Sequence, residues 1–262
     1  MAAPADDQVA RTGTPAAGGR RASTATIETR HRALANAKRL QALAPTLEHE
    51  RGLAEAYLDV GILDAALDHF TAALTLDPHD GVSLEATARI WRDWGYPAAA
   101  LSYAYRATYW MPASAGAQST LGTVLLTLGR FDAARVRFEH AQALEPGAAY
   151  PVNNLCYLEL RRARAEDAVR LCRQAATLDP LSQVVRNNLA TALTMAGELD
   201  AAAGVFTAGA TPAVAAYNQG VLWLMARKPA RAREAFGRSR TADPSFAPPI
   251  ARLRQLSAGE KR

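Results

Sequence analysis

The chain of 262 residues contains only two cysteines, Cys156 and Cys172. Two cysteines cannot form a disulfide framework or supply all four ligands of a structural zinc site. The sequence has no run of about 18 apolar residues, so it predicts no transmembrane helix. Residues 1–26 are rich in Ala, Gly, Pro, Thr and Arg and lack the apolar segment of a signal peptide, so we expect a disordered tail. These features favour a cytoplasmic protein, or a periplasmic one if translation starts upstream.

Sequence motifs of catalysis are missing as well. The five histidines do not occur at metal-ligand spacing: they are His31, His49, His69, His79 and His140. The sequence contains no glycine-rich phosphate loop, no nucleophile elbow and no HExxH motif. We therefore expect a protein that is not an enzyme and that holds neither a metal ion nor a cofactor.

Valine and isoleucine are sparse whereas alanine is abundant, which favours helices over sheets. Charge is unevenly distributed: residues 47–80 carry a net charge of −7 and residues 213–262 a net charge of +7, within a total of +5. Such a gradient can steer charged partners, and ordinary solvation of helix surfaces explains the same pattern.

Prolines recur every 34 residues, at Pro78, Pro112, Pro146 and Pro180. Pro244 follows 64 residues later, which is 34 plus 30, so one repeat lacks four residues. Twelve residues before each proline stands an alanine: Ala66, Ala100, Ala134, Ala168 and Ala232. Eight residues before stands a larger residue in most repeats, as in Phe70, Phe138 and Phe236. Small residues let two antiparallel helices approach closely, the Phe fills the space beside them, and the proline ends the second helix.

A turn with positive φ is expected between the paired helices of four repeats, at Gly61, Gly95, Gly129 and Gly197. The fourth repeat departs from this pattern, because Ala163 stands at its turn. The whole pattern resembles the tetratricopeptide repeat family, and one repeat contains Leu121-Gly122, Gly129, Ala134, Phe138, Ala141 and Pro146. The resemblance covers about residues 47–246. It implies an all-α, right-handed superhelical solenoid of about six helical hairpins with flanking helices.

We expect the array over residues 47–246, with repeats at 47–80, 81–114, 115–148, 149–182, 183–212 and 213–246. A leading helix is expected within residues 27–46, from Ile27 to Leu43, and residues 247–262 are expected to form a capping helix and tail. Such terminal helices cover the apolar faces that the end repeats would otherwise expose.

In this family the first helix of each hairpin lines a concave groove that receives an extended peptide or a partner helix. One inward position carries Asn154, Asn188 and Asn218. It resembles the asparagine ladder of the O-linked N-acetylglucosamine transferases, whose amides clasp a peptide backbone. Asparagine at this position would equally bridge neighbouring helices, so both interpretations stay open. Further groove residues are expected at Asn153, Asn187, Tyr157, Arg161, Thr191, Tyr217, Thr120, Arg89 and Arg92.

The leading hypothesis is a non-enzymatic scaffold that binds a peptide or partner protein in this groove, with no preference for an oligomeric state. One alternative is a bacterial assembly factor for pili, secretion or envelope machinery. Another is the accessory repeat region of an enzyme such as a glycosyltransferase. Nucleic-acid binding through the basic C-terminal end is a further alternative, although solvation explains these residues better: Arg227, Lys228, Arg231, Arg233, Arg238 and Arg240.

Two local features leave alternatives open. The aromatic residues from Trp91 to Trp110 either fill the space left by Ala104 or form an exposed anchor for a partner. Cys156 and Cys172 occupy packing positions of one hairpin, so they are either two small core residues or a disulfide of an oxidising compartment.

Overall fold

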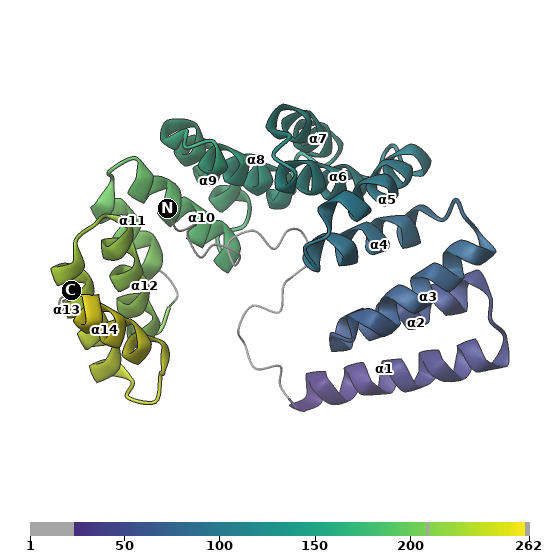
Figure 1. The fold of residues 1–262 in the computed structure, drawn as a ribbon, viewed down its shortest axis with the longest axis horizontal. Coiled ribbons are helices and arrows are strands. Elements are labelled where there is room, and N and C mark those ends of the chain that lie inside the picture. Colours follow the sequence, from purple (N-terminus) through teal and green to yellow (C-terminus); the bar gives the residue numbers. More distant parts are fainter. Residues whose placement is uncertain (1–23, 208–209, 260–262) are drawn as a thin grey trace. The chain divides into compact units, whose positions relative to one another are not determined.

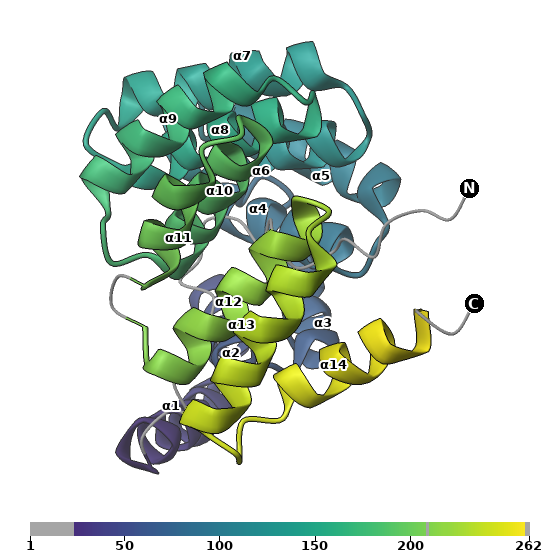
Figure 2. The ribbon, with the colours of Figure 1, turned by 90° about the vertical axis from the view of Figure 1, so that its left-hand side faces the viewer.

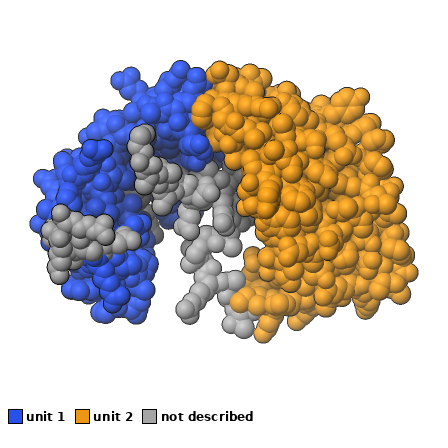
Figure 3. All heavy atoms as spheres, in the orientation of Figure 1, with its two compact units in different colours: residues 1–10, 147–262 blue, residues 11–146 orange. Residues whose placement is uncertain are grey.

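The computed structural model describes residues 24–207 and 210–259, which form 14 helices and no strand (Figure 1). The prediction of an all-α array of helical hairpins is thereby confirmed. The described residues divide into two compact units between Pro146 and Gly147 (Figure 3). We call residues 24–146 the N-terminal compact unit and residues 147–259 the C-terminal compact unit.

The N-terminal compact unit contains three hairpins behind one leading helix. Helix α1 (Thr24–Leu43) packs on α2, and the hairpins are α2 (Leu47–Val60) with α3 (Leu63–Leu76), α4 (Gly81–Asp93) with α5 (Pro97–Trp110), and α6 (Ala115–Thr127) with α7 (Phe131–Leu144). The second helix of each of the first two hairpins also packs on the first helix of the next, as α3 does on α4 and α5 on α6. The hairpins therefore stack in chain order.

The C-terminal compact unit repeats this arrangement. Its hairpins are α8 (Ala149–Arg161) with α9 (Ala165–Leu178), α10 (Gln183–Met195) with α11 (Leu199–Thr207), and α12 (Pro212–Met225) with α13 (Pro229–Ala242). Helix α14 (Pro248–Gly259) packs on α13 (Figure 2). Helix α11 is described over 9 residues whereas α9 and α13 have 14, and residues 208–209, which follow α11, lie outside the described residues.

Some helix ends differ from the expectations. Helix α1 begins at Thr24, so Thr24–Thr26 are helical rather than part of a disordered tail, and residues 1–23 of that predicted tail lie outside the described residues. Helix α12 begins at Pro212, the last residue of the range expected for the fifth repeat. Proline is favoured at the first position of a helix because its missing N–H needs no partner there.

The repeated small residues form the contacts between paired helices. Five alanines, one in each full-length repeat, have no exposed surface: Ala66, Ala100, Ala134, Ala168 and Ala232. Phe138 is also fully buried, and its ring lies so close to Gly122 that a Cβ on this glycine would overlap it. Gly220 meets the ring of Phe236 in the same way. The small residue and the aromatic ring thus fit one another across the hairpin.

The turns between paired helices have the expected backbone. Gly61, Gly95, Gly129 and Gly197 have φ angles between 74° and 85°, as predicted. Ala163 and Arg227 hold the equivalent place in two other repeats, with φ of 57° and 54°. These two residues accept a conformation that costs an L-residue with a Cβ about 1–2 kcal/mol.

Cys156 of α8 and Cys172 of α9 form a disulfide, with Cα atoms 5.2 Å apart and both residues fully buried. The bridge therefore cross-links the two helices of the fourth hairpin.

The aromatic residues of the second repeat divide into two groups: Trp91 and Trp94 are half-buried, whereas Tyr109 is 74% exposed. Among the described helices, none is both long and apolar enough to cross a membrane.

Candidate protein-binding surface

All twelve residues predicted to line a groove lie on the first helices of hairpins, namely on α4, α6, α8, α10 and α12. Four of these five helices start at a side chain that caps the first turn. The side chains of Asp80, Ser114, Ser182 and Thr211 each accept a hydrogen bond from a backbone N–H three residues later. Such caps define where each first helix begins and therefore which side chains share one face.

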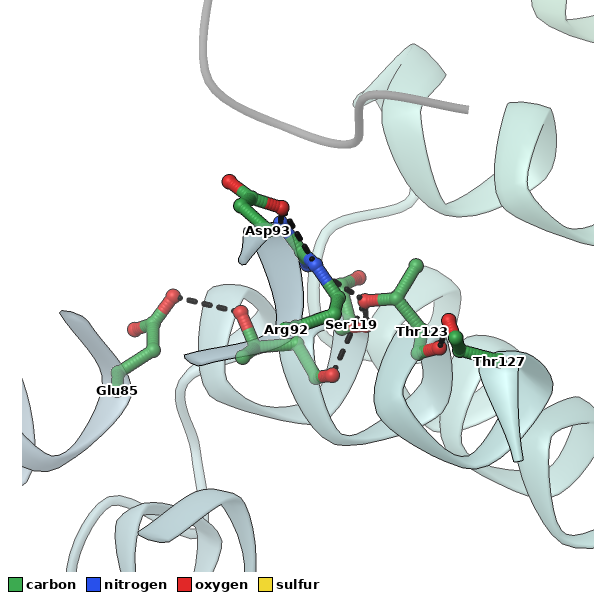
Figure 4. Close-up of polar contacts among 7 residues, drawn as sticks. Glu85, Arg92, Asp93, Ser119, Thr123 and Thr127 are labelled. Atoms are coloured by element: carbon green, nitrogen blue, oxygen red, sulfur yellow. Dashed lines mark hydrogen bonds and ion pairs between the residues drawn. The ribbon is translucent and has the colours of Figure 1, made fainter. Parts of the chain in front are cut away.

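In the N-terminal compact unit, polar side chains connect α4 to α6 (Figure 4). Thr120 Oγ1 donates to Glu85 Oε1 at 3.0 Å, and Arg92 Nη1 donates to Thr123 Oγ1 at 3.1 Å. The Arg92 guanidinium also donates from Nε and Nη2 to Asp93 Oδ1, at 2.9 and 2.7 Å. We call Glu85, Arg89, Arg92, Asp93 and Thr120 the charged patch.

Charges in this patch balance one another. Burial lowers the pKa of Arg89 from its usual value; Glu85 opposes this shift, Arg92 adds to it and Asp93 opposes it. Two arginines thus face two carboxylates, and Arg92 is already hydrogen-bonded twice to one of them. The charged patch is therefore fitted to hold α4 and α6 together rather than to capture a single anion.

The C-terminal compact unit carries a row of amides on α8, α10 and α12: Asn153, Asn154, Asn187, Asn188 and Asn218. We call this set the amide row. Asn188 Nδ2 donates to Asn153 Oδ1 at 3.0 Å, which joins α10 to α8. Asn188 is fully buried, so in this structure it bridges neighbouring helices.

Two atoms of the amide row, Asn154 Nδ2 and Asn188 Oδ1, are buried and have no hydrogen-bond partner among the described residues. Asn154 is 3% exposed, and an unpaired buried amide group costs about 1–3 kcal/mol. One atom is a donor and the other an acceptor. These are the two hydrogen-bonding functions that a peptide backbone would satisfy.

The remaining predicted residues are more open. Asn187, Asn218, Thr191, Tyr157 and Tyr217 are half-buried. Arg161 is exposed, with its guanidinium carbon 6.0 Å from the centroid of the Tyr157 ring. Asn187 Oδ1 accepts from Gln183, and the Tyr217 ring packs against Phe236 at a centroid distance of 5.5 Å. Asn187 and Asn218 are therefore the more accessible members of the amide row.

A regular contact in both compact units escaped the sequence analysis. Thr120 bonds to Glu85 and Asn188 bonds to Asn153, and each pair is 35 residues apart, which is one repeat plus one residue. Polar residues 35 positions apart in the sequence were the signal that could have predicted these contacts. Asp93, which fixes Arg92, was also missed, and nothing in the repeat pattern singles it out.

No family model matches the sequence, and no curated protein is similar enough to be recognised. Solved structures do match. The APC/C hetero-tetramer Cut9–Hcn1 matches with a TM-score of 0.70 and 18% identity, over 87% of this chain and 46% of that chain. A tetratricopeptide repeat protein from Parabacteroides merdae gives a TM-score of 0.67 and 17% identity, over 88% of this chain and 93% of the other.

A third similar structure is that of pilF from Pseudomonas aeruginosa, with a TM-score of 0.61 and 18% identity, over 81% of this chain and 97% of that chain. Our chain thus spans about half the length of the Cut9–Hcn1 chain and nearly all of the two bacterial proteins. The identities are low, so the similarity establishes the architecture. The chain therefore has the helical-hairpin fold of the tetratricopeptide repeat proteins.

Proposed function

We propose that this protein is a non-enzymatic scaffold that binds an extended segment of another protein along the amide row. The observation that carries the proposal is the set of accessible polar side chains along α8, α10 and α12, namely the half-buried Asn187 and Asn218 with the exposed Arg161. The Asn154 Nδ2 donor and the Asn188 Oδ1 acceptor, unpaired among the described residues, are buried, so a peptide C=O and N–H would meet them only once neighbouring side chains move aside. The half-buried side chains Asn187, Asn218, Thr191, Tyr157 and Tyr217, with the exposed Arg161, would contact the side chains of the same ligand.

The charged patch has a supporting role in this proposal. Arg89, Arg92 and Thr120 were expected to contact the ligand, and the bonds of Arg92 and Thr120 join α4 to α6. Because these bonds already hold α4 and α6 rigidly in the free protein, less conformational entropy is lost when a ligand binds. We therefore expect Arg92→Ala to weaken ligand binding less than a change in the amide row does.

A selection from a random peptide library on the purified full chain tests the proposal, followed by calorimetric titration of a selected peptide. Asn154→Ala is expected to weaken this peptide about tenfold, the effect of losing about 1.4 kcal/mol. Stability is expected to change little, because Asn154 Nδ2 has no partner among the described residues. Asn36→Ala, on the exposed surface of α1, is the matched control. Equal affinity of wild type and Asn154→Ala would remove the amide row from the binding site.

A second candidate is a bacterial factor that assembles pili, secretion or envelope machinery. The chain shares its helical-hairpin fold with pilF from Pseudomonas aeruginosa at 18% identity. Cell fractionation separates the candidates, because an assembly factor of this kind would be found with the envelope fraction. Recovery only in the cytosolic fraction would reject it and would fit the cytoplasmic location that we expect.

A third candidate is nucleic-acid binding through the basic residues of α13 and the turn before it. Arg227, Lys228, Arg231, Arg238 and Arg240 are exposed there. Contacts with phosphates release counterions, so binding would weaken steeply as salt rises. A gel shift at physiological salt that retains no complex would reject this candidate.

A further inference from the structure

The turn between α12 and α13 gathers positive charge around one aromatic ring. Lys228 Nζ lies 5.5 Å from the centroid of the Trp223 ring, and the guanidinium carbon of Arg231 lies 4.9 Å from it. Arg227, next to Lys228 in the chain, is exposed as well. We call Arg227, Lys228 and Arg231 the basic turn. Cation–π contacts of this kind hold two of its three charges in place.

Nothing in the described part of the chain neutralises these three charges. No carboxylate of the described residues lies within ion-pair distance of Arg227, Lys228 or Arg231. Residues 212–259 contain eight basic and two acidic side chains, a net charge of +6. Like charges held near one another repel, so an anionic partner would be attracted to the basic turn.

Arg227 gives a second, independent indication. It occupies the positive-φ place of its hairpin, which four other hairpins fill with glycine. Glycine adopts this backbone without strain, whereas the Cβ of arginine is strained in it. Strained residues of this kind concentrate at functional sites. A cation thus stands where the turn alone would favour glycine.

The same chain carries a surface of opposite charge. On α2 and α3, five exposed carboxylates have no ion-pair partner in the described structure, and we call them the acidic surface: Glu48, Glu55, Asp59, Asp64 and Asp68. Residues 24–80 together have a net charge of −4. The acidic surface belongs to the N-terminal compact unit and the basic turn to the C-terminal one.

From this charge complementarity we infer that the basic turn of one molecule docks on the acidic surface of a second copy. A polyanion such as nucleic acid would use the basic turn alone, whereas a second copy satisfies both surfaces. The two surfaces differ, so the contact is heterologous and continues from copy to copy into a ring or a filament. This inference is independent of peptide binding by the amide row.

Sedimentation velocity of the full chain tests the inference. At about 20 mM salt we expect species larger than the monomer, and at about 500 mM salt the monomer, because salt screens contacts between exposed charges. Lys228→Glu/Arg231→Glu and Asp64→Lys/Asp68→Lys are each expected to weaken self-association at least about tenfold. Circular dichroism verifies that both variants remain helical.

Mixing the two variants gives the sharpest result. The first variant keeps the acidic surface intact and the second keeps the basic turn intact, so the equimolar mixture is expected to pair through these two surfaces although neither variant associates alone. Arg130→Glu is the matched control, because Arg130 begins its second helix as Lys228 does and should leave association unchanged. A wild-type monomer at low salt, a mixture that stays monomeric, or an equal effect of Arg130→Glu would each overturn the inference.

Discussion

Single side chains at the helix contacts decide whether a hairpin of this chain closes. Gly122 lies against the fully buried ring of Phe138, whereas the space around Gly52 on α2 is open. Both glycines are helical, so replacing either with alanine gains about 1 kcal/mol of helix propensity. Only at Gly122 must the added methyl group displace a buried ring, which costs about 1–3 kcal/mol.

We therefore expect Gly122→Ala to lower the free energy of unfolding by about 1 kcal/mol and Gly52→Ala to raise it by a similar amount. Urea unfolding of the two variants, followed by circular dichroism, measures both. If the two substitutions stabilise the protein equally, the close approach between Gly122 and Phe138 does not govern hairpin packing.

Ala163 offers a test of the turn geometry. Its φ of 57° is unfavourable for alanine, so Ala163→Gly is expected to stabilise the protein by about 0.5–1 kcal/mol, after the greater freedom of glycine in the unfolded chain is counted. Ala196 is the control, because its φ of −75° is already favourable for alanine. Glycine there increases the freedom of the unfolded chain, which destabilises the protein, and relieves no backbone strain. A thermal unfolding midpoint that falls in both variants would contradict the strained turn.

At this scale the repeat positions were predictable and the exceptions were not. Alanines twelve residues before each proline and turn glycines follow directly from the 34-residue period. Arg227 stands 17 residues before Pro244, as Gly61 stands 17 residues before Pro78, but the sequence has no glycine there to mark its positive φ. The bridge from Asn188 to Asn153 depends on the offset between stacked repeats, which one repeat considered alone does not contain.

At the scale of helices, α1 is attached to the array by a polar contact as well as an apolar one. Leu34 of α1 packs against Leu53 and Ala56 of α2. Gln41 of α1 donates to Glu50 of α2 at 2.8 Å, and the Glu50 carboxylate lies 2.7 Å from Nδ1 of His69 on α3. One carboxylate thus connects three helices, an arrangement that the helical periodicity of α1 did not predict.

The pH dependence of stability follows from Glu50. Burial raises the pKa of Glu50, but hydrogen bonds from Gln41 and His69 and the charge of His69 lower it more, and the result lies below the usual 4.5. A carboxyl group with a lowered pKa stabilises the folded protein above the unfolded pKa and loses this contribution as pH falls through the folded value. Stability is therefore expected to decline below about pH 4.5.

Glu50→Gln removes the titrating group. We expect this variant to be about 1.5–3 kcal/mol less stable at pH 7, the range for hydrogen bonds to charged groups, and to lose less stability than wild type on acidification. Chemical unfolding between pH 7 and pH 3.5 compares the two proteins. Parallel pH profiles would show that Glu50 is not responsible for the acid sensitivity.

For the whole molecule, the sequence predicted the array and its order, because six hairpins in tandem leave few other ways to bury the small residues. It located all twelve candidate residues on first helices but did not separate buried side chains that bridge helices from accessible ones. Burial makes that distinction: Asn188 is fully buried, whereas Asn218 is half-buried and Arg161 is exposed. Which of these side chains are buried depends on the packing between repeats, which the 34-residue pattern does not specify.

The central claim is that a protein ligand binds along the first helices of the C-terminal compact unit. Hydrogen–deuterium exchange of the full chain, with and without a selected peptide, tests it most directly. We expect the peptide to slow amide exchange in α8, α10 and α12 and to leave α9 and α13 nearly unchanged. Protection confined to α9 and α13, or no protection at a saturating concentration of peptide, would contradict the claim.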